Sequence, residues 1–186
     1  MAKFEVVNKY LDTEKYPQCP VVLPVRATKN AAGYDFCASE TVLIPSYSHN
    51  VEQLKGYMAD KTMYSLPQVE GITKFTGIKP TLVPTGVKCK LDSNQYLEIT
   101  ARSSMPLKYW LVLANSEGII DSDYYGNESN DGEICFQLIN LAPSDIIIQQ
   151  GDKIGQGIIK TYITVEDEEE VTTERTGGFG STDDKN

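Results

Sequence analysis

Hydrophobic residues in this chain occur in short bursts that glycine, proline, asparagine and aspartate separate. The bursts are rich in Val, Ile, Leu, Tyr and Thr, which favour extended backbone, and turn residues bound them. Many short strands at this spacing predict an all-β sandwich, barrel or jelly roll. We expect strands at residues 21–25, 41–44, 81–90, 96–100, 133–140, 145–148 and 154–165.

Two stretches depart from this pattern. Val51, Leu54 and Met58 recur at helical spacing, which predicts a short helix over residues 51–61 inside an insert of about residues 46–80. From residue 166 an acidic run leads into a Gly-rich end with little to bury. We therefore expect a folded domain at residues 1–165 and a flexible C-terminal arm at residues 166–186.

Composition and charge exclude several classes of function. The 186 residues fit one domain, and a net charge of −9 argues against a nucleic-acid surface. We see no apolar stretch long enough to cross a bilayer and no export signal, so we expect a cytoplasmic protein. The four cysteines are scattered without a C-x-x-C pair, and the single histidine has no acidic or thiol cluster near it. A Cys/His zinc site and a histidine-based triad are therefore not expected.

Two motifs contain candidate ligands for phosphate or metal. Asp35 follows a glycine in the run at residues 31–38, where its carboxylate could face a cation or simply lie in a turn. Arg102, Ser103 and Ser104 follow a predicted strand. A guanidinium fork with adjacent hydroxyl and amide donors suits phosphate oxygens.

A third motif, at residues 114–126, is more specific. Asn115 and Gly118 bracket a hairpin-like turn, and a short strand then delivers Asp121, with Tyr124 three residues later. In an extended strand Asp121 and Asp123 would point to the same face, as two metal ligands or as one functional and one structural carboxylate. Surface turns are also rich in these residue types.

Two further motifs lie near the end of the chain. A Gly-Asp-Lys turn at residues 151–153 precedes a strand that carries Gln156, a potential amide donor. The run at residues 175–182 places Arg175 and Phe179 among glycines and hydroxyls. Its amides could wrap phosphates, and the phenyl ring could stack on a base.

In their order and spacing these five segments resemble the five motifs of the trimeric dUTPase family, in its bacterial and phage form. The resemblance runs from Ala31 to Thr182. It implies a β jelly-roll (β-clip) subunit, a homotrimer, and active sites that several chains build together. It also implies Mg²⁺-assisted hydrolysis of dUTP to dUMP and pyrophosphate, which keeps uracil out of DNA and supplies dUMP for dTTP synthesis.

The resemblance further implies a role for each motif residue. Asp121 would deprotonate the water that attacks the α-phosphorus, Tyr124 would pack under the deoxyribose and exclude a 2′-hydroxyl, and Asp35 would hold a water of the magnesium shell. The Mg²⁺ would be held mainly by the triphosphate. The expected phosphate contacts are Arg102, Ser103, Ser104 and Gln156. The expected uracil contacts, largely through backbone groups, are Asn115, Gly118, Ile119 and Ile120. In the arm, the expected contacts are Arg175 to phosphate, Phe179 stacked on uracil, and Gly180, Ser181 and Thr182 to the outer phosphates.

The chain departs from the family pattern at several positions. Ser104 and Trp110 stand where glycine is common, and Arg175 lies one residue nearer to Phe179 than usual. The insert at residues 46–80 and a longer hairpin at residues 127–132 lie outside the motifs.

Two alternatives stay open. A dCTP deaminase shares this fold but uses a glutamate where this chain has Gln137, and an amide cannot serve as that base. A regulatory protein that binds a repressor is the second alternative, and the inserts could supply the surface for such a partner.

Overall fold

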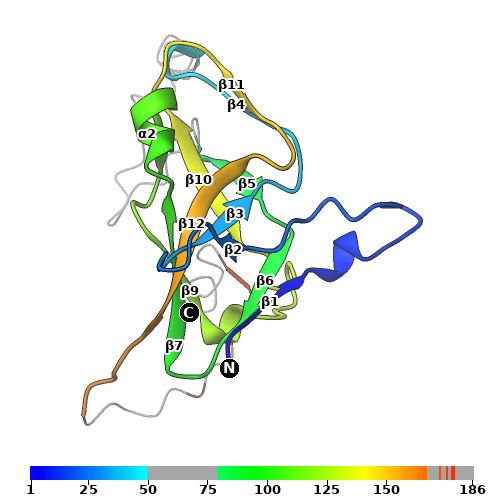
Figure 1. Ribbon diagram of the computed structural model, residues 1–186, viewed down its shortest axis with the longest axis vertical. Coiled ribbons are helices and arrows are strands. Elements are labelled where there is room, and N and C mark those ends of the chain that lie inside the picture. Colours follow the sequence, from blue (N-terminus) through cyan, green and yellow to red (C-terminus); the bar gives the residue numbers. More distant parts are fainter. Residues whose placement is uncertain (50–78, 167–171, 173–174, 176, 179–186) are drawn as a thin grey trace, which may run out of the picture.

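The computed structural model describes residues 1–49, 79–166, 172, 175, 177 and 178, and these form an elongated all-β body (Figure 1). Most strands contain β-branched or aromatic residues that pack on one or both faces. In chain order the elements are β1 (Lys3–Val6), η1 (Asn8–Tyr10), β2 (Val25–Arg26), β3 (Tyr34–Cys37), β4 (Val42–Ile44), β5 (Thr81–Pro84), β6 (Val87–Lys90), β7 (Gln95–Ala101), α2 (Ser104–Tyr109), β8 (Leu111–Leu113), β9 (Gly118–Asp121), η3 (Ser122–Tyr124), β10 (Cys135–Asn140), β11 (Ile146–Ile148) and β12 (Lys153–Thr161).

The strands pair antiparallel in four sheets. The largest has the order β2-β3-β12-β7-β9, and a second has the order β5-β10-β8. Two-stranded ribbons, β1-β6 and β11-β4, complete the fold. Among the described strands β9 pairs only with β7, so it forms an edge of the largest sheet. The candidate site lies beside this edge strand.

The core lies between the two larger sheets. Phe36 of β3 and Phe136 of β10 are fully buried, with ring centroids 5.8 Å apart. Gly155 of β12 is required at this contact, because a Cβ there would lie 1.9 Å from a ring carbon of Phe136. The remaining core side chains are mostly Val, Ile and Leu from the inward faces of the strands.

The all-β prediction is confirmed, and most of the expected strands are present with shifted ends. The expected strand at residues 81–90 is two strands, because Gly86 turns the chain with φ +70° between β5 and β6. The last strand ends at Thr161, so residues 162–165 were wrongly included. Near the N-terminus only Val25 of the expected strand at residues 21–25 is extended and paired.

Six elements were missed: the strands β1, β3 and β8, the helix α2, and the 3₁₀-helices η1 and η3. The strands are three or four residues long, too short for alternation to be evident. Helix α2 contains Pro106, which is tolerated in a first helical turn because the missing N–H has no partner to lose there. Residues 47–49 are helical, with Ser46 Oγ accepting the amide of His49 at 3.1 Å. The helix expected over residues 51–61 lies outside the described residues.

Within the described part of the chain, no helix combines the length and apolar character needed to cross a membrane.

Candidate active site

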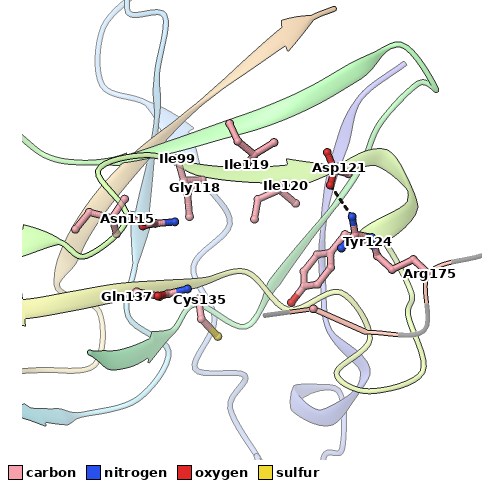
Figure 2. Close-up of a pocket in the computed structure, with 12 residues that line it drawn as sticks. Ile99, Asn115, Gly118, Ile119, Ile120, Asp121, Tyr124, Cys135, Gln137 and Arg175 are labelled. Carbon is pink, nitrogen blue, oxygen red and sulfur yellow. Dashed lines mark hydrogen bonds and ion pairs between the residues drawn. The ribbon is translucent and has the colours of Figure 1, made fainter. Parts of the chain in front are cut away.

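A pocket of about 190 Å³ opens between the edge strand β9 and strand β10 (Figure 2). Six residues of the third motif line it. The lining residues are Ile99, Leu113, Asn115, Gly118, Ile119, Ile120, Asp121, Tyr124, Cys135, Gln137, Arg175 and Gly178.

One wall of the pocket is the backbone of β9. Gly118 begins the strand against Ile99 of β7, where a Cβ would lie 2.6 Å from Ile99 Cγ1. In the part of the chain that the structure describes, β9 pairs with β7 on one side and with no strand on the other, which leaves that backbone edge available to a ligand. In Figure 2 the side chain of Ile120 points towards β10, and that of Ile119 points to the opposite side of the strand. The pocket therefore offers peptide donors and acceptors above an apolar side chain.

The turn before β9 differs from the expected hairpin. The chain reverses at residues 114–117, with Ser116 at φ +61°, but β8 pairs with β10 whereas β9 pairs with β7. The turn therefore connects two different sheets, and Asn115 lines the pocket at the end opposite Asp121. A pattern of turn residues cannot distinguish this sheet-to-sheet connection from a hairpin.

Asp121 ends β9 at one end of the pocket, where a guanidinium binds it. Arg175 Nη2 donates to Asp121 Oδ2 at 2.6 Å, and Arg175 Nε donates to Asp123 Oδ1 at 2.8 Å. The expectation that both aspartates lie on one extended strand is wrong, because residues 122–124 form the 3₁₀-helix η3. The two carboxylates still converge, on one arginine from the C-terminal arm.

Tyr124 closes the same end of the pocket. Its side chain is buried, and its hydroxyl donates to the carbonyl of Glu133 at 3.0 Å and accepts from Asn130 Nδ2 at 2.7 Å. Burial raises the pKa of the Tyr124 phenol, so it stays neutral. Gly178 of the arm packs on the ring, since a Cβ there would lie 2.7 Å from Tyr124 Cε2.

Sequence reasoning missed two residues of the pocket floor, Cys135 and Gln137, as site residues. Both project from β10 opposite the edge strand (Figure 2). Burial raises the pKa of the Cys135 thiol to about 12, so it is protonated and acts as a small apolar group. The alternation of β10 was the available signal, because Cys135 and Gln137 are two residues apart and share a face.

The first, second and fourth motifs meet elsewhere, around Asp35. Lys153 Nζ lies 2.8 Å from Asp35 Oδ2, and Arg102 Nε lies 3.7 Å from Asp35 Oδ1. Gln156 is the cross-strand neighbour of Asp35, and its side chain packs on Gly33, where a Cβ would lie 2.7 Å from Gln156 Oε1. Sequence reasoning did not select Lys153 as a site residue.

A second pocket, of about 290 Å³, adjoins this cluster. Arg102, Ser104 and Lys153 line it together with residues of α2 and β11. Ser103 is the N-cap residue of α2, and Trp110 is its C-cap in a left-handed conformation, with φ 54° and ψ 27°. This conformation explains why glycine suits position 110, since a Cβ is disfavoured there. The two pockets have no lining residue in common.

The arm is described only in part. Arg175 and Gly178 reach the first pocket, and Gly177 is buried. Phe179, Gly180, Ser181 and Thr182 lie outside the described residues, so their expected stacking and phosphate contacts stay predictions.

The described side chains alone do not form a binding site for a metal ion. Among residues 1–49, 79–166 and the described positions of the arm, no three His, Cys, Asp or Glu side chains are grouped to hold one. The Asp35 carboxylate is flanked by two cationic side chains. This chemistry fits a cation that arrives with phosphate ligands, because a hard divalent ion such as Mg²⁺ keeps phosphate and water in its shell.

Comparison with known proteins identifies relatives over most of this chain. The family model of dUTPase matches residues 69–183. A deoxyuridine 5′-triphosphate nucleotidohydrolase of Lactococcus lactis is 33% identical over 180 residues, which cover 96% of this chain and 95% of the relative. The crystal structure of dUTPase from Streptococcus mutans has a TM-score of 0.64 and 29% identity, and the match covers 88% of this chain and 98% of that chain.

A dUTPase structure from phage phi11 of S. aureus, described with a structural Mg(II) ion, has a TM-score of 0.58. The match covers 93% of this chain and 97% of that chain at 16% identity, and at this identity it supports the fold alone. The family model and the full-length relative decide the assignment and confirm the resemblance found in the sequence. The chain belongs to the dUTPase family.

Proposed function

We propose that this chain is a dUTP diphosphatase, which hydrolyses dUTP to dUMP and pyrophosphate by attack of water on the α-phosphorus. One observation carries the proposal: Asp121 stands at the end of an edge strand whose free backbone lines the pocket. A carboxylate beside a nucleobase-sized pocket is placed to act on the part of a nucleotide next to the sugar.

The base would bind along β9. Uracil presents one N–H donor between two carbonyl acceptors, and the free edge of Gly118, Ile119 and Ile120 offers alternating peptide groups of the complementary kind. Asn115 and Gln137, which also line the pocket, would add side-chain amide groups to these backbone contacts. The deoxyribose would rest on the buried ring of Tyr124, where an additional 2′-hydroxyl would meet the ring.

The reaction then needs a base, a water and stabilisation of charge. Asp121 would take the proton of the water as its oxygen bonds to the α-phosphorus, and the bond to the bridging oxygen would break, so that pyrophosphate leaves with the electron pair. Arg102, Ser103, Ser104 and Gln156 would donate to the phosphoryl oxygens, and Arg175 would supply a further guanidinium.

A homotrimer would bring these two sets of residues together. On one chain the phosphate-binding candidates Arg102 and Ser104 line a different pocket from Asp121 and Tyr124. A site built across copies, with the base pocket from one chain and the Arg102 cluster from its neighbour, would use both. This arrangement supports the trimer that the resemblance implies.

Mg²⁺ would enter with the triphosphate, and Asp35 is the residue that would hold a water of its shell. When bound, the ion neutralises phosphate charge and orients the triphosphate. Lys153 and Arg102 already compensate the charge of Asp35. We expect them to turn towards the phosphates when a nucleotide binds.

The alternative of a dCTP deaminase is not favoured. Gln137 lies in the pocket, where that chemistry would need a base, and its amide cannot accept a proton in that role. A regulatory role through binding of a repressor, and a cytoplasmic location, stay predictions from the sequence.

The test is pyrophosphate release from the four deoxynucleoside triphosphates and UTP, each with Mg²⁺ and with EDTA. We expect release from dUTP alone, and only with Mg²⁺. Asp121→Asn should lower kcat by at least about 100-fold, the scale of general-base catalysis, with folding intact. The matched control, Glu128→Gln, removes an exposed charge nearby and should keep full activity. Uracil nucleotide formed from dCTP, or normal turnover by Asp121→Asn, would overturn the proposal.

A further inference from the structure

The guanidinium of Arg175 is bound by two carboxylates through two different nitrogens. Nε donates to Asp123 and the terminal Nη2 donates to Asp121. Two hydrogen bonds from two nitrogens of a planar group fix its orientation as well as its position. The Arg175 side chain is about one-quarter exposed, whereas those of Asp121 and Asp123 are about half exposed.

This contact holds part of the arm against the pocket. Gly178, three residues after Arg175, packs on the ring of Tyr124, and Gly177 is buried. Asp123 immediately precedes Tyr124 on η3. The ion pair with Asp123 and the Gly178 contact therefore join the arm to η3 at two adjacent residues, and the ion pair with Asp121 joins it to the end of β9.

The two carboxylates are not equivalent. The bond to Asp121 engages the residue expected to deprotonate water, and it uses a terminal nitrogen that phosphates would also take. The bond to Asp123 uses Nε, next to the aliphatic stem, and leaves both terminal nitrogens free to turn to another anion. Asp123 has no part in the proposed reaction.

We propose that Asp123 is a positioning residue that docks Arg175 at the pocket, and that the phosphates of an incoming nucleotide draw the guanidinium from Asp121 while Asp123 retains it. The proposal rests on the proposed function for the identity of the nucleotide. Before the nucleotide binds, Arg175 compensates the charge of Asp121. Afterwards Asp121 is free to bind water, and Arg175 faces the phosphates from a fixed anchor.

Hydrogen–deuterium exchange of the peptide that contains residues 175–178 tests the docking without any turnover. In the nucleotide-free protein, Asp123→Asn and Asp121→Asn should each speed exchange by about two- to five-fold, the scale of a partly exposed ion pair. Glu128→Gln is the charge-matched control and should leave exchange unchanged. In an Arg175→Ala background, Asp123→Asn should add nothing. Unchanged exchange in Asp123→Asn would overturn the docking role.

The second arm of the experiment adds a dUTP analogue with an imido group between the α- and β-phosphates, together with Mg²⁺. With the analogue bound, Asp123→Asn should still speed exchange, whereas Asp121→Asn should no longer do so. An equal effect of both variants would overturn the release of Asp121.

Steady-state kinetics separate this inference from the proposed function. Asp123→Asn should lower kcat/KM for dUTP, Asp123→Glu should restore part of it, and neither should have an effect in the Arg175→Ala background. If the wild type fails to hydrolyse dUTP while exchange still depends on Asp123, the proposed function fails and the docking stands. Normal hydrolysis with exchange that is indifferent to Asp123 overturns the docking alone.

Discussion

Asn130 Nδ2 donates a 2.7 Å hydrogen bond to the hydroxyl of Tyr124, which in turn donates to the carbonyl of Glu133. The turn that supplies Asn130 is held by its own side chains, since Asn127 Nδ2 donates to Asn130 Oδ1 at 2.8 Å. The loop at residues 127–132, which the motifs do not include, is therefore the support of a pocket residue. The hairpin expected there is a network of turns.

Removing the Asn130 amide should loosen Tyr124. For Asn130→Ala we expect the free energy of unfolding to fall by about 1–2 kcal/mol, because a buried hydroxyl loses a partner. If Tyr124 excludes the 2′-hydroxyl, the ratio of kcat/KM for dUTP to that for UTP should also fall several-fold. Urea denaturation and the two activity assays measure these effects, with Glu128→Gln on the same loop as the control. A preserved ratio would show that the ring needs no support from the loop.

Gly155→Ala should disrupt the contact between the two larger sheets. A Cβ at this position would lie 1.9 Å from Cε1 of the fully buried Phe136, so ring and strand must separate. We expect a loss of about 1–3 kcal/mol in the free energy of unfolding, the usual cost of overpacking a core. Thermal denaturation measures it, and Ser93→Ala in an exposed turn is the control. An unchanged melting temperature would contradict the close packing of β12 on Phe136.

Alkaline pH should destabilise the fold through buried acids, of which Cys89 and Tyr10 are two. Burial raises the pKa of Cys89 from 9.0 to about 12 and, with a hydrogen bond to Glu40, that of Tyr10 from 10.0 to about 12. The folded chain thus keeps protons that the unfolded chain releases, so stability is complete below about pH 9 and falls as pH rises towards 12. The raised pKa of Tyr10 accounts for a loss of about 2–3 kcal/mol in the free energy of unfolding over this pH range.

Urea titrations between pH 8 and pH 11 measure this slope. Tyr10→Phe should flatten it above pH 10, even if the variant starts from a lower stability through loss of the hydrogen bonds to Ser39 and Glu40. The same slope in the variant would show that Tyr10 does not stay protonated in the fold.

The sequence predicted what depends on local chemistry. The strands rich in β-branched residues, the turn before β9, and the set Asp121, Tyr124 and Arg175 in one region were all found along the chain, and the pocket contains all three. Their roles in catalysis stay predictions. A local sequence pattern can identify extended segments and residues whose side chains are suited to binding or catalysis.

Local sequence patterns could not predict which strands pair or which distant side chains meet. The ion pair of Lys153 with Asp35 joins residues 118 positions apart, and it follows from the register of β12 on β3. Gln137 enters the pocket because β10 lies opposite β9 in another sheet. The 3₁₀ turn that brings Asp123 to Arg175 is three residues long, and no periodicity marks it.

Trp110 provides a test in which a substitution should raise stability. This residue ends α2 with φ 54° and is 64% exposed, so it bears the strain of a left-handed conformation and buries little in return. Glycine adopts this conformation without the cost of about 1–2 kcal/mol that a Cβ imposes. Glycine also has more conformational entropy in the unfolded chain, which offsets about half of this gain. Trp110→Gly should therefore raise the free energy of unfolding by up to about 1 kcal/mol. Leu107→Gly, at a similarly exposed but right-handed helical position, should lower it by about the same amount. Chemical denaturation of the two variants side by side gives the comparison, and a loss of stability in both would mean that Trp110 makes contacts that outweigh its strain.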